Sequence, residues 1–206
     1  MSTVTSVIDR IDAALDMAHG IVETTTPGQL QAPSFCPGWN VRFELNHLVG
    51  GMHIFAAELT GTDAGADHHA DWLGTDHRAA FTTAAALDRA AWHRPDALDT
   101  TVRLGFGAVP GPTAALVHLT EILVHSADLA VLNGREDLVD QRQCADLLAT
   151  MRAMDFDAFR RPGMFAAEQR APADAAAHRR LLAFTGRDLE AAARPVSGNG
   201  PRPHAG

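Results

Sequence analysis

The stretch HLTEILVHSAD, residues 118–128, constrains the fold more than any other part of the chain. Its polar side chains His118, Glu121, His125 and Asp128 stand among residues that are mainly Leu, Ile, Val and Ala. With 3.6 residues per helical turn, these four positions fall along one face of a helix. A surface helix has a broad polar half, whereas this one has a single polar line between apolar flanks. We therefore expect a buried helix whose polar line points at something inside the protein.

The remaining apolar periodicity predicts further helices around this one. Residues spaced three and four apart predict helices over about 4–24, 41–59, 77–93, 113–132 and 137–160, and a short one within 174–187. Asn40 and Asp76 are suited to cap the second and third helices, and Asn133-Gly134 suits the end of the fourth. Residues 95–112 break the pattern and suit a short extended hairpin.

The predicted fold class is therefore all-α, a bundle of four main helices with an additional short C-terminal helix. We expect one helical domain over residues 1–190 and a disordered tail over 191–206.

Composition excludes several kinds of partner and chemistry. The chain of 206 residues carries 25 acidic and 17 basic side chains, a net charge of −8, so no nucleic-acid partner is expected. It has no Lys and no Tyr, which removes Schiff-base and tyrosine acid chemistry. We expect no membrane partner, because no apolar run approaches the roughly 20 residues of a membrane span. The N-terminus lacks a signal-peptide core and two cysteines form no disulfide framework, so the expected location is cytoplasmic.

Glu121 and His125 have the spacing of a helical metal-binding pair. They are four residues apart, about 6 Å along the axis, whereas His118 lies about 10.5 Å from His125 and is the weaker ligand. Asp128, one turn beyond His125, is placed to orient its ring. A third ligand must come from elsewhere, and His47 in the predicted second helix is the candidate.

His47, Glu121 and His125 would form the two-His, one-carboxylate set of a catalytic zinc with one open position. Gly50 and Gly51, one turn after His47, would allow a close approach of another backbone. The alternative for each histidine is an ordinary buried residue with a hydrogen-bond partner.

Other polar residues have weaker functional signals. Cys36 precedes the start of a helix, where a thiolate could be stabilised, but we interpret it as a small residue in a turn. We interpret Cys144, which lies on an apolar helical stripe, as a core residue. We interpret Asp67, His68, His69 and Asp71 as a solvated loop and His53 as a packing or surface residue. The remaining two signals, a nucleotide loop at Gly105-Phe106-Gly107 and a serine nucleophile at Ser126, lack the required context.

Three stretches together, CPGWNVRFELNHLVGG, TEILVHSADLA and RLLAFTGR, resemble the DinB-like metalloproteins. The resemblance is to an actinobacterial group related to the N-terminal domain of mycothiol-dependent maleylpyruvate isomerase, and it runs from about residue 5 to 189. It implies a four-helix bundle that holds a divalent metal, usually zinc, with His47, Glu121 and His125 at the ligand positions. The isomerase has a further C-terminal domain that this chain does not match, which removes the support for maleylpyruvate as the substrate.

Three functions remain open. The first is a zinc-dependent thiol transferase or isomerase in which a low-molecular-weight thiol, mycothiol in the relatives, attacks a small electrophilic substrate. Candidate catalytic residues are Asp128, His118 and Arg42, the last for anion binding. The second is a hydrolase using zinc-bound water with His118 as base, and the third is a non-catalytic binder of a metal or small ligand. Substrate contacts are expected from the 60–76 and 94–112 loops, and a homodimer is compatible with the sequence.

Overall fold

The computed structural model describes residues 6–65, 70–161 and 164–192 of the chain. The elements are α1 (Val7–Thr24), α2 (Val41–Thr60), α3 (His77–Trp92), β1 (Thr101–Leu104), β2 (Gly107–Pro110), α4 (Gly111–Asn133), α5 (Gln141–Arg152), α6 (Ala177–Phe184) and α7 (Leu189–Ala192). Short 3-10 turns occupy Pro27–Gln29, Ala97–Asp99, Glu136–Leu138 and Phe156–Phe159.

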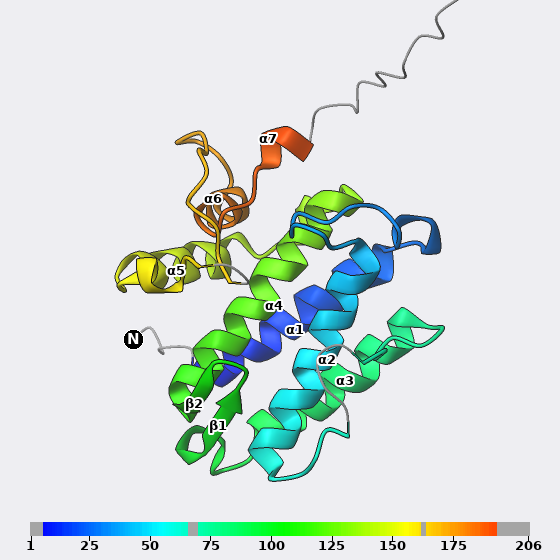
Figure 1. The fold of residues 1–206 in the computed structure, drawn as a ribbon, viewed down its shortest axis with the longest axis vertical. Coiled ribbons are helices and arrows are strands. Elements are labelled where there is room, and N and C mark those ends of the chain that lie inside the picture. The colour runs from blue at the N-terminus through cyan, green and yellow to red at the C-terminus, as the bar shows by residue number, and fades with distance from the viewer. Residues whose placement is uncertain (1–5, 66–69, 162–163, 193–206) are drawn as a thin grey trace, which may run out of the picture.

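Helices α1 to α4 form a four-helix bundle (Figure 1). In this bundle α1 packs along α4 and α3, and α2 packs along α3 and α4. Helices α5 and α6 pack on each other and on α4, on the side of α4 away from α3. The predicted all-α, DinB-like architecture is confirmed.

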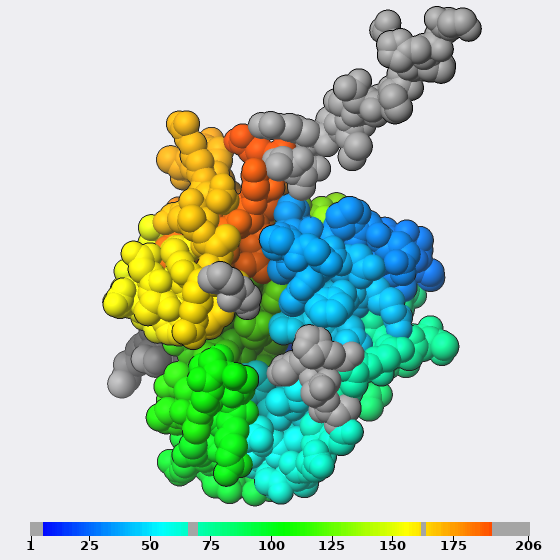
Figure 2. All heavy atoms as spheres, in the orientation of Figure 1, coloured from blue at the N-terminus to red at the C-terminus, as the bar shows by residue number. Residues whose placement is uncertain are grey.

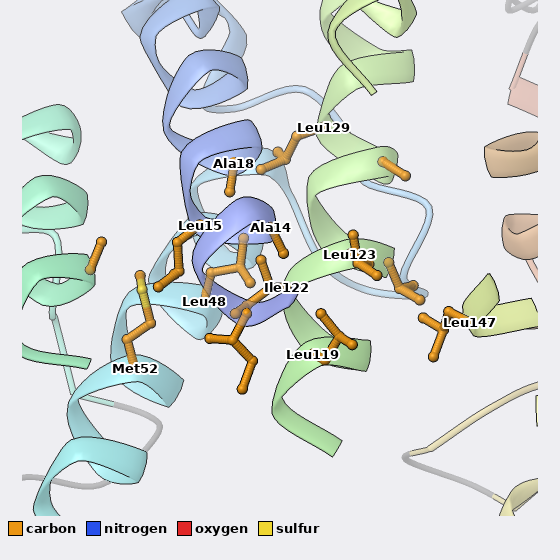
Figure 3. Close-up of a cluster of buried hydrophobic side chains, with 14 of the residues drawn as sticks. Ala14, Leu15, Ala18, Leu48, Met52, Leu119, Ile122, Leu123, Leu129 and Leu147 are labelled. Carbon is orange, nitrogen blue, oxygen red and sulfur yellow. The ribbon is translucent and has the colours of Figure 1, made fainter. Parts of the chain in front are cut away.

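The bundle core is built from the apolar stripes of the helices. Leu15, Leu48, Met52 and Ile122 meet between α1, α2 and α4, each at most 4 % exposed (Figure 3). Close packing of this kind fixes the rotation of each helix about its axis, because a turned helix would leave voids or clashes. The polar positions on α2 and α4 are thereby held in fixed directions.

Most predicted helix boundaries are confirmed. The Asn40 side chain accepts a hydrogen bond from a backbone N–H of α2, and Asp76 accepts two from α3. Helix α4 ends at Gly134, whose φ of 67° favours glycine. The helix predicted over 137–160 is wrong in length: Asp140 caps a shorter α5, which ends at Arg152 and is flanked by 3-10 turns.

The predicted hairpin is present between α3 and α4. Its strands pair antiparallel with Val102 opposite Val109, and Val102 is fully buried against the bundle. Phe106 stands in the turn between the strands and is 47 % exposed. The hairpin therefore carries an aromatic side chain on a short, anchored arm.

Helix α4 has the length and the composition of a membrane span, contrary to the expectation that no such run exists. The candidate span covers Gly111–Asn133, but 72 % of its most apolar window is buried inside the protein. Burial among the other helices accounts for its apolar composition, as for the core helix of a bundle.

Gly50 is required by the packing of the 70–76 loop, whereas Gly51 is not. A Cβ atom on Gly50 would lie 2.6 Å from Cδ1 of Trp72, and one on Gly51 would meet nothing within 4 Å. The same loop is held by Asn46, which donates to the carbonyl of Ala70 and accepts from the backbone N–H of Trp72. The predicted close approach is thus made by an indole ring at Gly50, not by a backbone.

This contrast predicts opposite effects of alanine at neighbouring positions. Gly50→Ala should be less stable than Gly51→Ala by about 1–2 kcal/mol, because both gain helix propensity but only the first displaces Trp72. Urea unfolding of the two variants beside the wild type measures the difference. Equal stabilities would show that the Trp72 ring moves aside without cost.

Candidate metal centre

His47, Glu121 and His125 converge where α2 crosses α4. Nε2 of His47 lies 2.9 Å from Oε2 of Glu121, and Nε2 of His125 lies 3.3 Å from the same oxygen. One ligand atom from each residue falls within 4.8 Å of the other two. The two helices thus bring together the donors that the spacing alone suggested.

The second ring nitrogen of His125 is held by a residue that the sequence analysis missed. Nδ1 of His125 lies 2.8 Å from Oε1 of Glu44, whereas Asp128 is at 3.7 Å. Glu44 is on α2, fully buried. Its signal was available: position 44 falls on the apolar stripe of Val41, Leu45 and Leu48, where a carboxylate needs a partner.

Asp128 pairs with an arginine from the C-terminal segment. Arg187, between α6 and α7, donates from Nε and Nη2 to Oδ2 of Asp128, at 3.0 and 2.9 Å. Both side chains are at most 7 % exposed, and Arg187 also donates to Sγ of Cys36 at 3.5 Å. A buried carboxylate requires such a charged partner. Asp128, which the sequence places to orient the His125 ring, is thus the more distant carboxylate at Nδ1, and Glu44 makes the hydrogen bond.

Cys36, Glu44, His125 and Asp128 form a second group with metal-ligand spacing. The guanidinium of Arg187 already stands beside two of its members, Cys36 and Asp128. A divalent cation among these four residues, which we call the inner group, would face the positive charge of Arg187. This argues against the inner group as a metal site. In the other group, His47, Glu121 and His125, which we call the outer group, no described arginine forms an ion pair with the carboxylate of Glu121.

Charge in the outer group is balanced through hydrogen bonds. Burial raises the pKa of Glu121, but its contacts with His125 and His47 lower it more, and the result is well below the usual value. Burial lowers the pKa of His125, while Cys36, Glu121 and Glu44 raise it well above the usual value. A metal ion at this site would take the place of the proton on His125, as is general for imidazole ligands.

The pKa values of Asp128 and Glu44, the two carboxylates of the inner group, are shifted in opposite directions. Burial raises the pKa of Asp128 to about 7, with Arg187 opposing the rise and Glu44 adding to it. The pKa of Glu44 is lowered, because burial raises it less than His125, Ser34 and Asp128 together lower it. Glu44 is therefore the ionised acceptor for the ring N–H of His125.

The donor geometry fits zinc. Two ligands of a tetrahedral zinc with bonds of 2.0–2.2 Å lie about 3.3–3.5 Å apart. The distances of 2.9 and 3.3 Å from Glu121 to the two imidazoles differ from this by a few tenths of an ångström at most. Two imidazoles and a carboxylate are also the donor types of catalytic zinc sites.

Trp39 packs against both histidines. Its ring lies 5.0 Å from that of His47 and is stacked on that of His125 at 5.8 Å. Trp39 is placed by the loop before α2, where Val41 and Arg42 donate backbone hydrogen bonds to the carbonyls of Ala32 and Leu30. The indole therefore lies against one side of the candidate metal centre.

The three donors open into a cavity of about 780 Å³. The surface is hollowed where the hairpin, α2 and the C-terminal segment meet (Figure 2). Its walls are Phe35, Cys36, Pro37, Trp39, His47, Phe106, Glu121, His125, Arg160, Arg161, Met164, Phe165, Ala166, Ala167, Thr185, Gly186 and Arg187. The expected contribution of the 94–112 segment is present in Phe106. No described residue of 60–76 lines this cavity, and residues 160–161, 164–167 and 185–187 provide walls that the sequence did not predict.

His118 and Arg42 do not line the cavity. Nε2 of His118 lies 2.7 Å from Oδ2 of Asp88 on α3, and both side chains are buried between helices. Arg42 donates to Asp71 and to the carbonyl of Gly74, so it holds the 70–76 loop. The geometry contradicts their prediction as catalytic residues at this site.

The remaining candidates take structural or peripheral places. Cys144 is buried, and burial raises its pKa to about 12, as predicted for a core thiol. His53 stacks on Trp72. Ser126 is buried within α4. Cys36 lines the cavity, which the reading as a simple turn residue did not anticipate, and Asp67, His68 and His69 lie outside the described residues.

Comparison with known proteins bears on this site. The family model described as the mycothiol maleylpyruvate isomerase N-terminal domain matches residues 11–130, more than half of the chain. The chain belongs to this family. The match includes His47, Glu121 and His125 and ends before Arg187 and the C-terminal walls of the cavity.

Two curated relatives extend the likeness beyond the family model. Both are uncharacterized proteins of Mycobacterium tuberculosis, from strains CDC 1551 and H37Rv. Each is 29 % identical to this chain over 177 residues, which cover 85 % of this chain and 94 % of the relative. No solved structure matches the chain significantly.

The Arg187–Asp128 pair predicts an asymmetric loss of stability. Arg187→Gln should lower the free energy of unfolding by about 3–5 kcal/mol, because it leaves a buried carboxylate without its cation. The double variant Arg187→Gln/Asp128→Asn should regain part of this loss. Urea unfolding measures all three proteins, with Arg180→Gln, an exposed neighbour on α6, as the control. A single variant as stable as that control would contradict the assignment.

Proposed function

We propose that this protein is a zinc-dependent enzyme that joins a low-molecular-weight thiol, such as mycothiol, to a small electrophilic molecule, by thiol transfer or by isomerisation. The observation that carries the proposal is the convergence of His47, Glu121 and His125 at the wall of a cavity large enough for both reactants. Membership of the mycothiol-related family supports the choice of thiol.

The metal would be held by Nε2 of both histidines and by the carboxylate of Glu121. When bound, zinc supplies a positive charge that lowers the pKa of a thiol, so that a nucleophile is present near neutral pH. The exposed fractions of the His47 and Glu121 side chains, 26 % and 35 %, leave the donors accessible from the cavity.

The protein's own residues prepare the site for this chemistry. Glu44 accepts a hydrogen bond from Nδ1 of His125, which would leave the lone pair of Nε2 for a metal ion bound beside Glu121. Trp39 packs against both imidazoles and limits the directions in which their rings can turn. Arg187 neutralises Asp128, so that the carboxylate next to His125 does not compete for its proton.

Hydrolysis is less well supported, because the base proposed for it is engaged elsewhere. His118 pairs with the buried Asp88 and does not line the cavity. A binding protein without turnover is the remaining alternative, which the thiol experiment separates. We propose a small-molecule partner and a cytoplasmic location, where thiols are kept reduced.

The ligand assignment predicts which histidine holds zinc. His125→Ala should lose most bound zinc, because it removes a donor and its Glu44-oriented ring, whereas His118→Ala should retain it. Elemental analysis of protein purified without a histidine tag gives the zinc content per chain. Folding of each variant is checked by circular dichroism. Zinc retained in His125→Ala and lost in His118→Ala would reverse the assignment.

The thiol proposal predicts that turnover depends on an added thiol. Zinc-loaded protein is assayed over a panel of small electrophiles with mycothiol, with cysteine and with water alone. We expect product formation with mycothiol, at least about tenfold slower with His47→Ala, since that variant loses a ligand. Turnover with water alone would indicate a hydrolase. Tight thiol binding without turnover across the panel would indicate a binding protein.

A further inference from the structure

The cavity carries aromatic walls that the thiol proposal does not use. Phe35, Phe106 and Phe165 line it from three separate segments: the loop before α2, the hairpin turn and the stretch after α5. Phe106 is 47 % exposed, a large apolar surface left in water. Phe165 is supported from behind by Phe156, with ring centroids 5.0 Å apart. Aromatic surface gathered in this way is favourably covered by another apolar body.

The three arginines that line the cavity differ in whether a carboxylate pairs with them. Arg187 is paired with Asp128. Arg160 donates to Asp157 and to the carbonyl of Phe184. The side chain of Arg161 contacts only the sulfur of Met164 within the described chain, and no described carboxylate pairs with it.

Other described arginines, such as Arg170 and Arg180, also lack a carboxylate partner, but of these unpaired arginines Arg161 is the one that lines the cavity. An arginine at the wall of a small-molecule cavity favours an anionic group on the ligand, through charge-assisted hydrogen bonds. The three phenylalanines favour an aromatic group on the ligand, and Arg161 favours an anionic group.

We propose that the cavity binds a small molecule with a flat aromatic body and a single anionic group, the ring against Phe106 and Phe165 and the anion beside Arg161. This inference rests on the proposed function, since it names the substrate class for the same cavity. A volume of about 780 Å³ accommodates two fused rings with a substituent.

A matched pair of fluorescent probes tests both ends of this ligand. 1-Anilinonaphthalene-8-sulfonate carries the aromatic body and one anionic group, and N-phenyl-1-naphthylamine carries the same body without the charge. Each is titrated into the full-length, metal-free protein and into the zinc-loaded protein. We expect one sulfonate probe bound per chain in both forms, with the emission shift of an apolar site.

Variants separate the aromatic wall from the charge. Phe106→Ala should weaken both probes about tenfold, since about half of a phenylalanine side chain is no longer covered. Arg161→Gln should weaken the sulfonate about fivefold and leave the neutral probe within twofold, as expected for an exposed charge. The controls are Leu87→Ala, as exposed as Phe106 but on α3, and Arg170→Gln, an exposed arginine outside the cavity.

Three results would overturn the inference: no saturable binding of the sulfonate probe, equal losses in Phe106→Ala and Leu87→Ala, or an Arg161→Gln variant that binds the sulfonate like the wild type. The metal-free titration keeps this test apart from the proposed function. Probe binding in a protein that takes up no zinc leaves the ligand class in place and removes the metal-dependent chemistry. Zinc uptake without probe binding does the reverse.

Discussion

The hydrogen bond between Nδ1 of His125 and the buried carboxylate of Glu44 is the contact on which the metal centre depends. It crosses from α4 to α2, the same two helices that supply the donors, so the packing of the bundle and the direction of the imidazole are determined together. A fully buried glutamate is costly without a partner, and the hydrogen bond from the imidazole to Oε1 offsets part of that cost. The polar line on α4 therefore stabilises the helix crossing as well as presenting ligands.

The four polar positions of that line meet three different parts of the chain. His118 contacts α3, Glu121 and His125 contact α2, and Asp128 contacts Arg187 of the C-terminal segment. Only the middle two open into the cavity. Along α4, His118 thus has a structural role and Glu121 and His125 form the candidate ligand pair. Asp128 holds the C-terminal segment whose residues line the cavity.

The sequence predicted the bundle and the three converging donors, because periodicity and the spacing of Glu121 and His125 are local properties. It did not predict Arg187 or the cavity walls at 160–161 and 164–167, whose contacts join positions far apart in the chain. His118 was misjudged for the same reason: spacing places a residue on a face, but Asp88 on α3 decides what that face meets. Glu44 had a local signal, an acid on an apolar stripe, that was overlooked.

The ion pair between Arg187 and Asp128 joins two parts of the chain that have different roles at the cavity. The donors come from α2 and α4, while residues after α5 shape the space in front of them. The family match ends at residue 130, ahead of that later segment. A change in the residues after α5 would therefore reshape the space in front of the three donors without moving the helices that carry them.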